Sequence, residues 1–403
     1  MPESRIRPAG AVGSSGLRIA LIGTRGVPAK YGGFETCVEE VGSRLASLGH
    51  DVTVYCRSSS ETSPDEYLGM RLIHLPSIRR RSLETLSHTG LSVNHLLWNR
   101  TDVAIVFNAA NAPWLPVIRA AGIPVATHVD GLEWKRAKWG KIGKRYYRSV
   151  EALAVRWSDA LIADAKGIQA YYRERFDAST EYLAYGAPIL DDAGSEKVRE
   201  IGLEPSEYHL VVARLEPENH VHLIVDGYRR SSARLPLVIV GTAPYAPAYI
   251  EKIRSLADDR VRFLGGVWDQ KLLDQLYANA LVYWHGHSVG GTNPSLLRAI
   301  GAGAATNAFD VDFNSEVLGD AGRYFAESED VVRLVEAAER DRQDCETRGL
   351  LAREAAGRYD WDDVALRYET LCYELHDRGR RPGRRRAVTA PTIAAPSTSA
   401  AAR

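Results

Sequence analysis

Two successive series of short apolar runs, each run followed by a helical pattern, constrain the fold of this chain most. In the first series the expected strands are residues 17–22, 51–56, 103–107, 125–128 and 160–163. In the second series they are residues 209–213, 237–240, 261–264 and 280–284. Continuous apolar runs are typical of buried parallel strands, and their alternation with helices predicts βαβ units. The sequence therefore predicts an α/β chain with two Rossmann-like, doubly wound domains that face each other across a cleft.

The periodicity pauses over residues 187–206, where we place a linker. This gives a first domain at 17–186, a second at 207–358 and a last helix at 359–376. Two domains also agree with the length of 403 residues, because single cores stop growing near ~250–300 residues. We expect disorder in residues 1–16 and in the basic, Ala/Pro-rich tail 377–403, which cannot bury a core.

The composition excludes several classes of protein. Fifty-one basic residues balance fifty-one acidic ones, which argues against nucleic acid as a partner. The four cysteines form no CxxC and no Cys/His cluster, so we expect no metal site and a reducing cytoplasm. No apolar run reaches the ~18 residues of a membrane span, and the N-terminus does not resemble a signal peptide.

Two glycine-rich turns can bind an anion. The first, residues 23–35 (GTRGVPAKYGGFE), lies between a strand and a helix, and is neither GxGxxG nor a P-loop. The second, residues 290–298 (GGTNPSLLR), places Asn293 as a helix cap and Pro294 at the first helical position. Free N–H groups at such helix starts suit a phosphate or diphosphate. A plain mobile loop and an ordinary capped helix are the alternatives.

Two further segments follow strands. Arg214, in ARLEPEN (213–219), can grip phosphate oxygens, or it can be a surface arginine that pairs with Glu216 or Glu218. His128 and Asp130, in THVDGLEW (127–134), lie where open α/β sheets bind ligands and can handle protons or hold a sugar. A histidine satisfied within the core is the alternative for His128.

A basic and aromatic stretch spans residues 134–148. It has seven cations, two tryptophans, two tyrosines and no acidic residue. Cations for anionic headgroups and rings for the interface are typical of membrane-surface binding, and a solvated basic face is the alternative. The residues expected at an anionic membrane surface are Trp134, Lys135, Arg136, Lys138, Trp139 and Lys141.

The motifs together resemble glycosyltransferase family 4 of the GT-B fold, and within it the bacterial rhamnosyltransferase branch. The similarity covers roughly residues 17–376 and is carried by 23–36, 127–141, 213–219 and 285–297. It implies a retaining, metal-independent hexosyltransferase (EC 2.4) without a cofactor. The implied donor is a nucleotide sugar, commonly dTDP-rhamnose. The implied acceptor is a lipid-linked sugar at the inner membrane face, in cell-surface polysaccharide synthesis.

The resemblance also assigns roles to residues. It implies that His128 lies beside the transferred sugar, that Arg214 neutralises the leaving diphosphate, and that the last helix crosses back onto the first domain. With Asp130, these two residues are the catalytic candidates. The residues expected around the nucleotide sugar are Arg25, Gly32, Gly33, Glu218, Gly265, Gly291, Thr292, Asn293 and Arg298.

The chain departs from the family pattern at three positions. Most of family 4 has two glutamates seven residues apart, and here Gly290 and Arg298 occupy those positions. Asn219 replaces a lysine that usually follows the family arginine. Arg298 cannot accept a hydrogen bond from a ribose, so it either grips a phosphate or weakens donor binding. A non-catalytic nucleotide-sugar or lipid-binding member and a nucleotide-sugar epimerase therefore remain alternatives.

Overall fold

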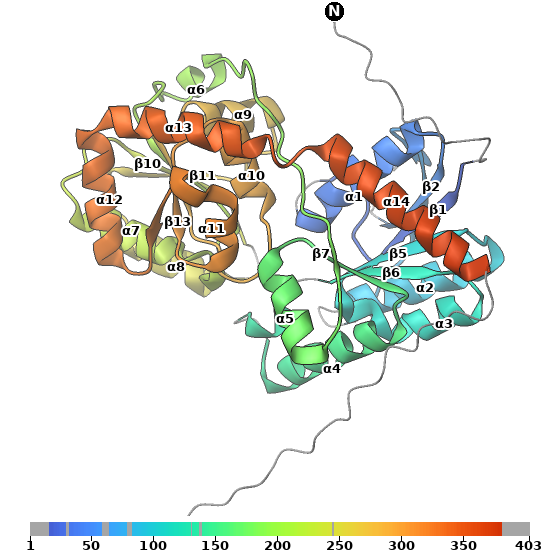
Figure 1. Ribbon diagram of the computed structural model, residues 1–403. Coiled ribbons are helices and arrows are strands. Elements are labelled where there is room, and N and C mark those ends of the chain that lie inside the picture. The colour runs from blue at the N-terminus through green and yellow to red at the C-terminus, as the bar shows by residue number, and fades with distance from the viewer. Residues whose placement is uncertain are drawn as a thin grey trace, which may run out of the picture.

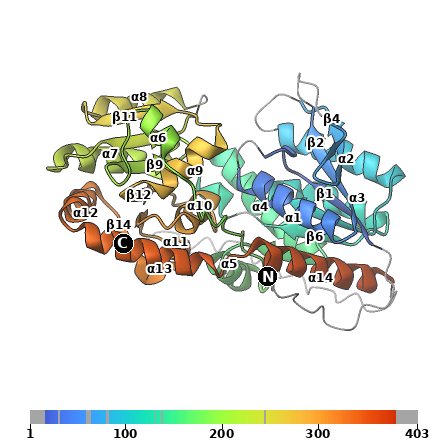
Figure 2. The same ribbon diagram turned by 90° about the horizontal axis from the view of Figure 1, so that it is seen from above.

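The computed structural model describes residues 16–29, 32–58, 64–78, 83–129, 131–136, 139–243 and 246–380. Two α/β domains lie side by side, and the last helix runs from the second domain back onto the first (Figure 1, Figure 2). Each domain is built around a sheet with helices on its faces, as the alternation in the sequence predicts. Each domain is thus a Rossmann-like unit, as the sequence predicts.

The first sheet has the strand order β3-β4-β2-β1-β5-β6-β7-β8, and every neighbouring pair is parallel except β3 with β4. Its strands are β1 (Arg18–Ile22), β2 (Asp51–Arg57), β3 (Glu66–Tyr67), β4 (Met70–Leu75), β5 (Val103–Phe107), β6 (Val125–His128), β7 (Ala160–Ala163) and β8 (Glu181–Tyr182). The helices of this domain are α1 (Gly33–Ser47), α2 (Glu84–Trp98), α3 (Leu115–Ala120), α4 (Lys141–Trp157) and α5 (Lys166–Phe176).

The second sheet is wholly parallel, with the order β11-β10-β9-β12-β13-β14. Its strands are β9 (His209–Val212), β10 (Leu237–Val240), β11 (Val261–Gly265), β12 (Val282–His285), β13 (Thr306–Phe309) and β14 (Gly322–Phe325). The helices are α6 (Glu196–Glu200), α7 (Val221–Arg230), α8 (Pro247–Leu256), α9 (Gln270–Ala278), α10 (Pro294–Gly301), α11 (Asp312–Leu318), α12 (Ser328–Arg340), α13 (Arg342–Ala356) and α14 (Trp361–Arg380).

The nine expected strands are all present, with ends that shift by at most two residues. The sequence does not predict β3, β4, β8, β13 and β14, and it predicts no element in the linker, where α6 forms. The strands β13 (TNAF) and β14 (GRYF) contain asparagine or glycine and lack the β-branched run that marks the others. Of the tail expected to be disordered, residues 377–380 continue α14, and 381–403 lie outside the described residues.

Helix α14 ties the two domains together by packing along α1 (Figure 1). Its buried Tyr368 hydroxyl lies 3.0 Å from Nδ1 of His128 and 3.6 Å from Sγ of Cys37. Nε2 of the buried His50 lies 3.0 Å from the Glu369 carboxylate. Apolar burial and these polar contacts fix the helix on the first domain, as the resemblance implies.

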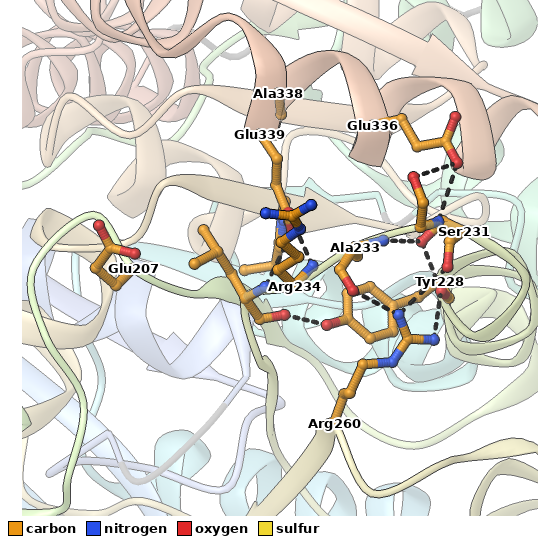
Figure 3. A network of polar contacts seen from close by, with 12 residues as sticks. Glu207, Tyr228, Ser231, Ala233, Arg234, Arg260, Glu336, Ala338 and Glu339 are labelled. Atoms are coloured by element: carbon orange, nitrogen blue, oxygen red, sulfur yellow. Dashed lines mark hydrogen bonds and ion pairs between the residues drawn. The ribbon is translucent and has the colours of Figure 1, made fainter.

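A polar network holds the amino ends of β9 and β10 together (Figure 3). It lies on the side of the second sheet opposite the carboxyl ends of the strands. The Glu339 carboxylate accepts hydrogen bonds from the N–H groups of Arg234 (2.8 Å) and Leu235 (3.1 Å). The Arg260 guanidinium donates to the carbonyl of Ala233 at 2.7 Å and pairs with Asp258 at 2.6 Å. The polar groups at the amino ends of these strands are therefore used in structural hydrogen bonds and ion pairs.

Candidate functional site

The strand order reverses beside a central strand in both sheets, between β1 and β5 in the first and between β9 and β12 in the second. Open α/β sheets bind ligands beyond the carboxyl ends of the strands at such points. The segments that follow β1, β9 and β12 are residues 23–32, 213–219 and 286–293. Three of the motifs selected from the sequence thus lie at the two switch points.

The turn between β12 and α10 is shaped by glycines and an asparagine cap. Asn293 accepts a hydrogen bond from the N–H of Ser295 at 2.9 Å, and Pro294 is the first helical residue, as predicted. A Cβ on Gly290 would lie 2.7 Å from Nε2 of His287, and one on Gly291 would lie 2.0 Å from Oδ1 of Asp164. Only glycine fits such close approaches, and the helix start carries partial positive charge.

Arg214 follows β9 and leaves 39% of its side chain exposed. Its guanidinium lies 3.5 Å from Oε2 of the buried Glu216, so the predicted pairing with Glu216 is present. The Asn219 amide donates to the Arg214 carbonyl at 2.7 Å and lies 2.8 Å from Nδ1 of His287. Asn219, which replaces the family lysine, thus fixes the Arg214 backbone and joins it to the turn after β12.

Electrostatics keep His287 neutral. Burial lowers the pKa of His287 well below its ordinary value, and the positive charges of Arg136 and Arg214 lower it further. The neighbouring Glu218 is buried, and its carbonyl accepts a hydrogen bond from the N–H of Ser288 at 3.0 Å. Arg214 is thus an exposed positive group near His287 and the turn before α10.

The glycine-rich turn of the first domain faces the start of α10. A Cβ on Gly33 would lie 3.5 Å from Cδ of Pro294. Gly32 has a φ of +112°, which favours glycine. The N–H of the exposed Arg25 donates to the Glu35 carboxylate at 3.0 Å. This backbone donor of the turn is therefore already used by a residue of the first domain. The turn thus faces the second domain with backbone N–H groups, but the negative Glu35 carboxylate lies beside them.

The two domains touch at the carboxyl ends of their strands. The Thr292 hydroxyl donates to the carbonyl of Asp164, which follows β7, at 2.6 Å. A Cβ on Gly131 would lie 2.3 Å from Cα of Gly290, so these two backbones nearly meet. The predicted cleft is thus closed at this point, and residues from both domains surround the turn after β12.

Comparisons with known families agree with this architecture. A model described as "Glycosyl transferase 4-like domain" matches residues 32–186, and one described as "Glycosyl transferases group 1" matches residues 207–344. Together the two models cover most of the chain, and each model matches one domain. The chain is a glycosyltransferase of the GT-B type.

Solved structures show the same fold at low identity. Sucrose-phosphate synthase from Thermosynechococcus elongatus is 18% identical with a TM-score of 0.77, over 90% of this chain and 100% of that one. Anabaena HepE in complex with UDP is 16% identical with a TM-score of 0.71, over 89% and 100%. Trehalose 6-phosphate synthase from Burkholderia multivorans is 10% identical with a TM-score of 0.69, over 91% and 100%. No protein of curated function matches the chain in sequence.

Arg298 of this glycosyltransferase points to α9. Its guanidinium forms an ion pair with the carboxylate of Asp274, and both side chains are largely buried. Asp274 thus offsets the charge of Arg298, and a contact of Arg298 with a phosphate stays a prediction. A hollow of about 520 Å³ lies beside this pair, between residues 189–193 and the start of α9.

His128 lies inside the core of the first domain. Its ring is fully buried between Phe34, Phe107 and Tyr185, and burial lowers its pKa to about 3. Its Nδ1 faces the Tyr368 hydroxyl, but its Nε2 is buried without a hydrogen-bond partner in the described part of the chain, so the ring lies in the core without being fully satisfied there. A catalytic role for His128 stays a prediction, and Asp130 lies outside the described residues.

Gly265 ends β11 at the edge of the second sheet. Its φ of +70° favours glycine, and its carbonyl accepts a hydrogen bond from the N–H of Gly241 at 2.7 Å. Open space surrounds the position of its missing Cβ. A role of Gly265 in binding the nucleotide sugar stays a prediction.

The membrane-surface prediction needs correction at Arg136. Arg136 is buried and pairs with Glu133 at 2.5 Å, so it cannot reach a membrane. Trp139 is half-buried, packs on Tyr147 and donates from Nε1 to Glu133 at 3.2 Å.

The other residues of that stretch lie closer to solvent. Lys135 and Lys141 are exposed, whereas Trp134 is half-buried beneath the guanidinium of Arg148. Lys138 lies outside the described residues. The exposed basic face continues along the first turns of α4.

Sequence reasoning missed Asp164 and His287, which contact the turn after β12, and Asp274, which neutralises Arg298. Both His287 and Asp164 follow predicted strands. Their position after the carboxyl ends of strands was the sequence feature that could have identified them as site residues. The described residues contain no group of three or more His, Cys, Asp or Glu arranged for a metal ion. None of the helices in the described part of the chain is both long enough and apolar enough to cross a bilayer.

Proposed function

We propose that this glycosyltransferase transfers a hexose from a nucleotide sugar to a lipid-linked sugar acceptor, with retention and without a metal ion. The observation that carries the proposal is the exposed Arg214 guanidinium at a switch point of the second sheet, where its charge lowers the pKa of His287 in the turn before α10. HepE structures in complex with UDP and with UDP-glucose support a nucleotide-sugar donor. The four sequence motifs favour dTDP-rhamnose among such donors.

The chemistry follows from the charge of the leaving group. A nucleoside diphosphate gains negative charge as the glycosidic bond breaks, and fixed N–H dipoles and cations stabilise it best in a site that excludes water. Arg214 supplies the cation, and the turn of residues 290–294 supplies backbone donors and a helix start. The contacts of Gly131 and Asp164 with this turn close the site and limit hydrolysis of the donor.

An acceptor at a membrane surface fits the exposed face at the start of α4. Lys135, Lys141 and Lys144 are exposed there, together with Ile142, whose exposed fraction is 88%. Cations beside an exposed aliphatic side chain suit an anionic lipid surface. We therefore place the enzyme peripherally at the inner face of the plasma membrane.

The test is transfer from dTDP-rhamnose to membrane-lipid extract, followed as release of dTDP. We expect Arg214→Ala to lower the rate by at least ~10²-fold, as the loss of one transition-state stabiliser does. The matched control is Arg229→Ala, an arginine of α7 that is 49% exposed and also paired with an acid. It should leave the rate unchanged.

Two other outcomes separate the alternatives. Consumption of the donor without any acceptor would indicate an epimerase. Binding of the donor without consumption would indicate a non-catalytic member. An Arg214→Ala variant as active as the wild type would contradict the role of this arginine.

A further inference from the structure

A row of alternating charges runs from the first domain to Arg214 in the second. Glu133 and Arg136 follow β6, and they form an ion pair of 2.5 Å. Arg136 also lies 3.8 Å from Oε2 of Glu216, across the boundary between the domains. The same Glu216 oxygen lies 3.5 Å from the Arg214 guanidinium. The order is therefore acid, base, acid, base, with one member of the central pair from each domain.

Burial distinguishes the members of this row. The exposed side-chain fractions are 9% for Glu133, 10% for Arg136 and 4% for Glu216, against 39% for Arg214. Charges removed from water are costly unless opposite charges offset them. The three inner groups thus depend on one another, and the row ends on the one arginine that solvent and a ligand can reach.

The backbone around Glu216 is also fixed. Its N–H donates to the Arg214 carbonyl at 2.8 Å, and its carbonyl accepts from the N–H of Asn219 at 3.0 Å. The Trp139 indole donates to Glu133 at the other end of the row. Because these backbone bonds hold the turn, Glu216 stays between Arg136 and Arg214.

We propose that Glu216 and Arg136 are positioning residues that couple closure of the two domains to the charge that Arg214 offers to the leaving diphosphate. The inference rests on the proposed function of Arg214. With the domains apart, Glu216 loses Arg136, and one cation fewer offsets its carboxylate beside Arg214. With the domains together, Arg136 shares that carboxylate and leaves more of the Arg214 charge to the diphosphate. The site thus gains its full positive potential only when it is closed.

The test compares Arg136→Gln, Glu216→Gln and the double variant in transfer from dTDP-rhamnose. Arg136→Gln should lower kcat about 10- to 100-fold, the scale of a misplaced catalytic group, and change KM less. The double variant should be faster than Arg136→Gln alone, because a neutral Glu216 position no longer competes for Arg214. A merely structural salt bridge predicts that the rates of the three variants follow their free energies of unfolding, measured by urea denaturation. The coupling predicts that Arg136→Gln loses kcat even under conditions in which the variant is fully folded.

Two controls keep the result interpretable. Arg136→Lys retains the charge and should keep the rate within about threefold of the wild type, which separates charge from folding. Arg119→Gln breaks the 3.2 Å ion pair with Asp159, at the amino end of β7, and should not change kcat.

The outcomes also separate this inference from the proposed function. An active wild type whose Arg136→Gln variant keeps its kcat, or whose double variant is slower than Arg136→Gln, would overturn the coupling alone. A folded wild type that transfers no sugar would overturn the proposed function and the coupling with it.

Discussion

At the scale of single residues, the pair formed by Arg298 and Asp274 explains why this chain tolerates an arginine where the resemblance to family 4 implies a glutamate. The two side chains are 24% and 22% exposed, and they join α10 to α9. A glutamate at position 298 would face Asp274 without a cation between them. The positive charge of Arg298 thus offsets the negative charge of Asp274.

We therefore expect Arg298→Glu to lower the free energy of unfolding by about 1 kcal/mol or more, the range between exposed and buried pairs. Urea denaturation measures this change. The combined Asp274→Arg and Arg298→Glu variant should recover most of the loss. Arg333→Glu, at the exposed end of a pair with Asp330 on α12, is the control and should cost less. Equal stability of the wild type and Arg298→Glu would contradict the pairing.

At the scale of elements, the first turns of α4 carry the proposed membrane contact. Replacement of Lys141, Lys144 and Arg145 by glutamine should lower binding to vesicles of phosphatidylglycerol and phosphatidylcholine. Each cation near an anionic surface contributes about 1 kcal/mol, so three contribute a factor of roughly 100. Vesicle sedimentation at low salt measures the loss.

The matched control for this face is glutamine at Arg229, Arg234 and Lys252, three exposed cations of the second domain. It changes the net charge equally and should retain binding. If both triple variants bind vesicles as the wild type does, the α4 face is a solvated basic surface.

Local chemistry decided which elements the sequence could predict. The start of α10 was predicted to the residue, because an asparagine cap followed by proline is a local signal. The strands β13 and β14 were not, because their pairing with β12 depends on tertiary contacts rather than on their own residues. The burial of Arg136 within a basic stretch was also unpredictable, since Glu216, 80 positions later, is one of its partners.

At the scale of the whole molecule, the two domains present their switch points to each other. Contacts of Thr292 with Asp164, Gly131 with Gly290 and Arg136 with Glu216 surround the turn before α10. The sequence predicts both sheets and their loops, because each lies within one domain. It does not predict which residues meet between the domains, since those contacts depend on how α14 and the linker orient them.

The central claim is that Arg214 and the turn before α10 bind the diphosphate of a nucleotide sugar. The most direct measurement is calorimetric titration of the wild type with dTDP, UDP, GDP and ADP, and with the monophosphate of whichever binds best. The account predicts that one diphosphate binds at least about tenfold more tightly than its monophosphate, the worth of a charge-assisted contact. Arg214→Ala should remove that difference and Arg229→Ala should keep it. No binding of any diphosphate, or equal binding of diphosphate and monophosphate, would contradict the claim.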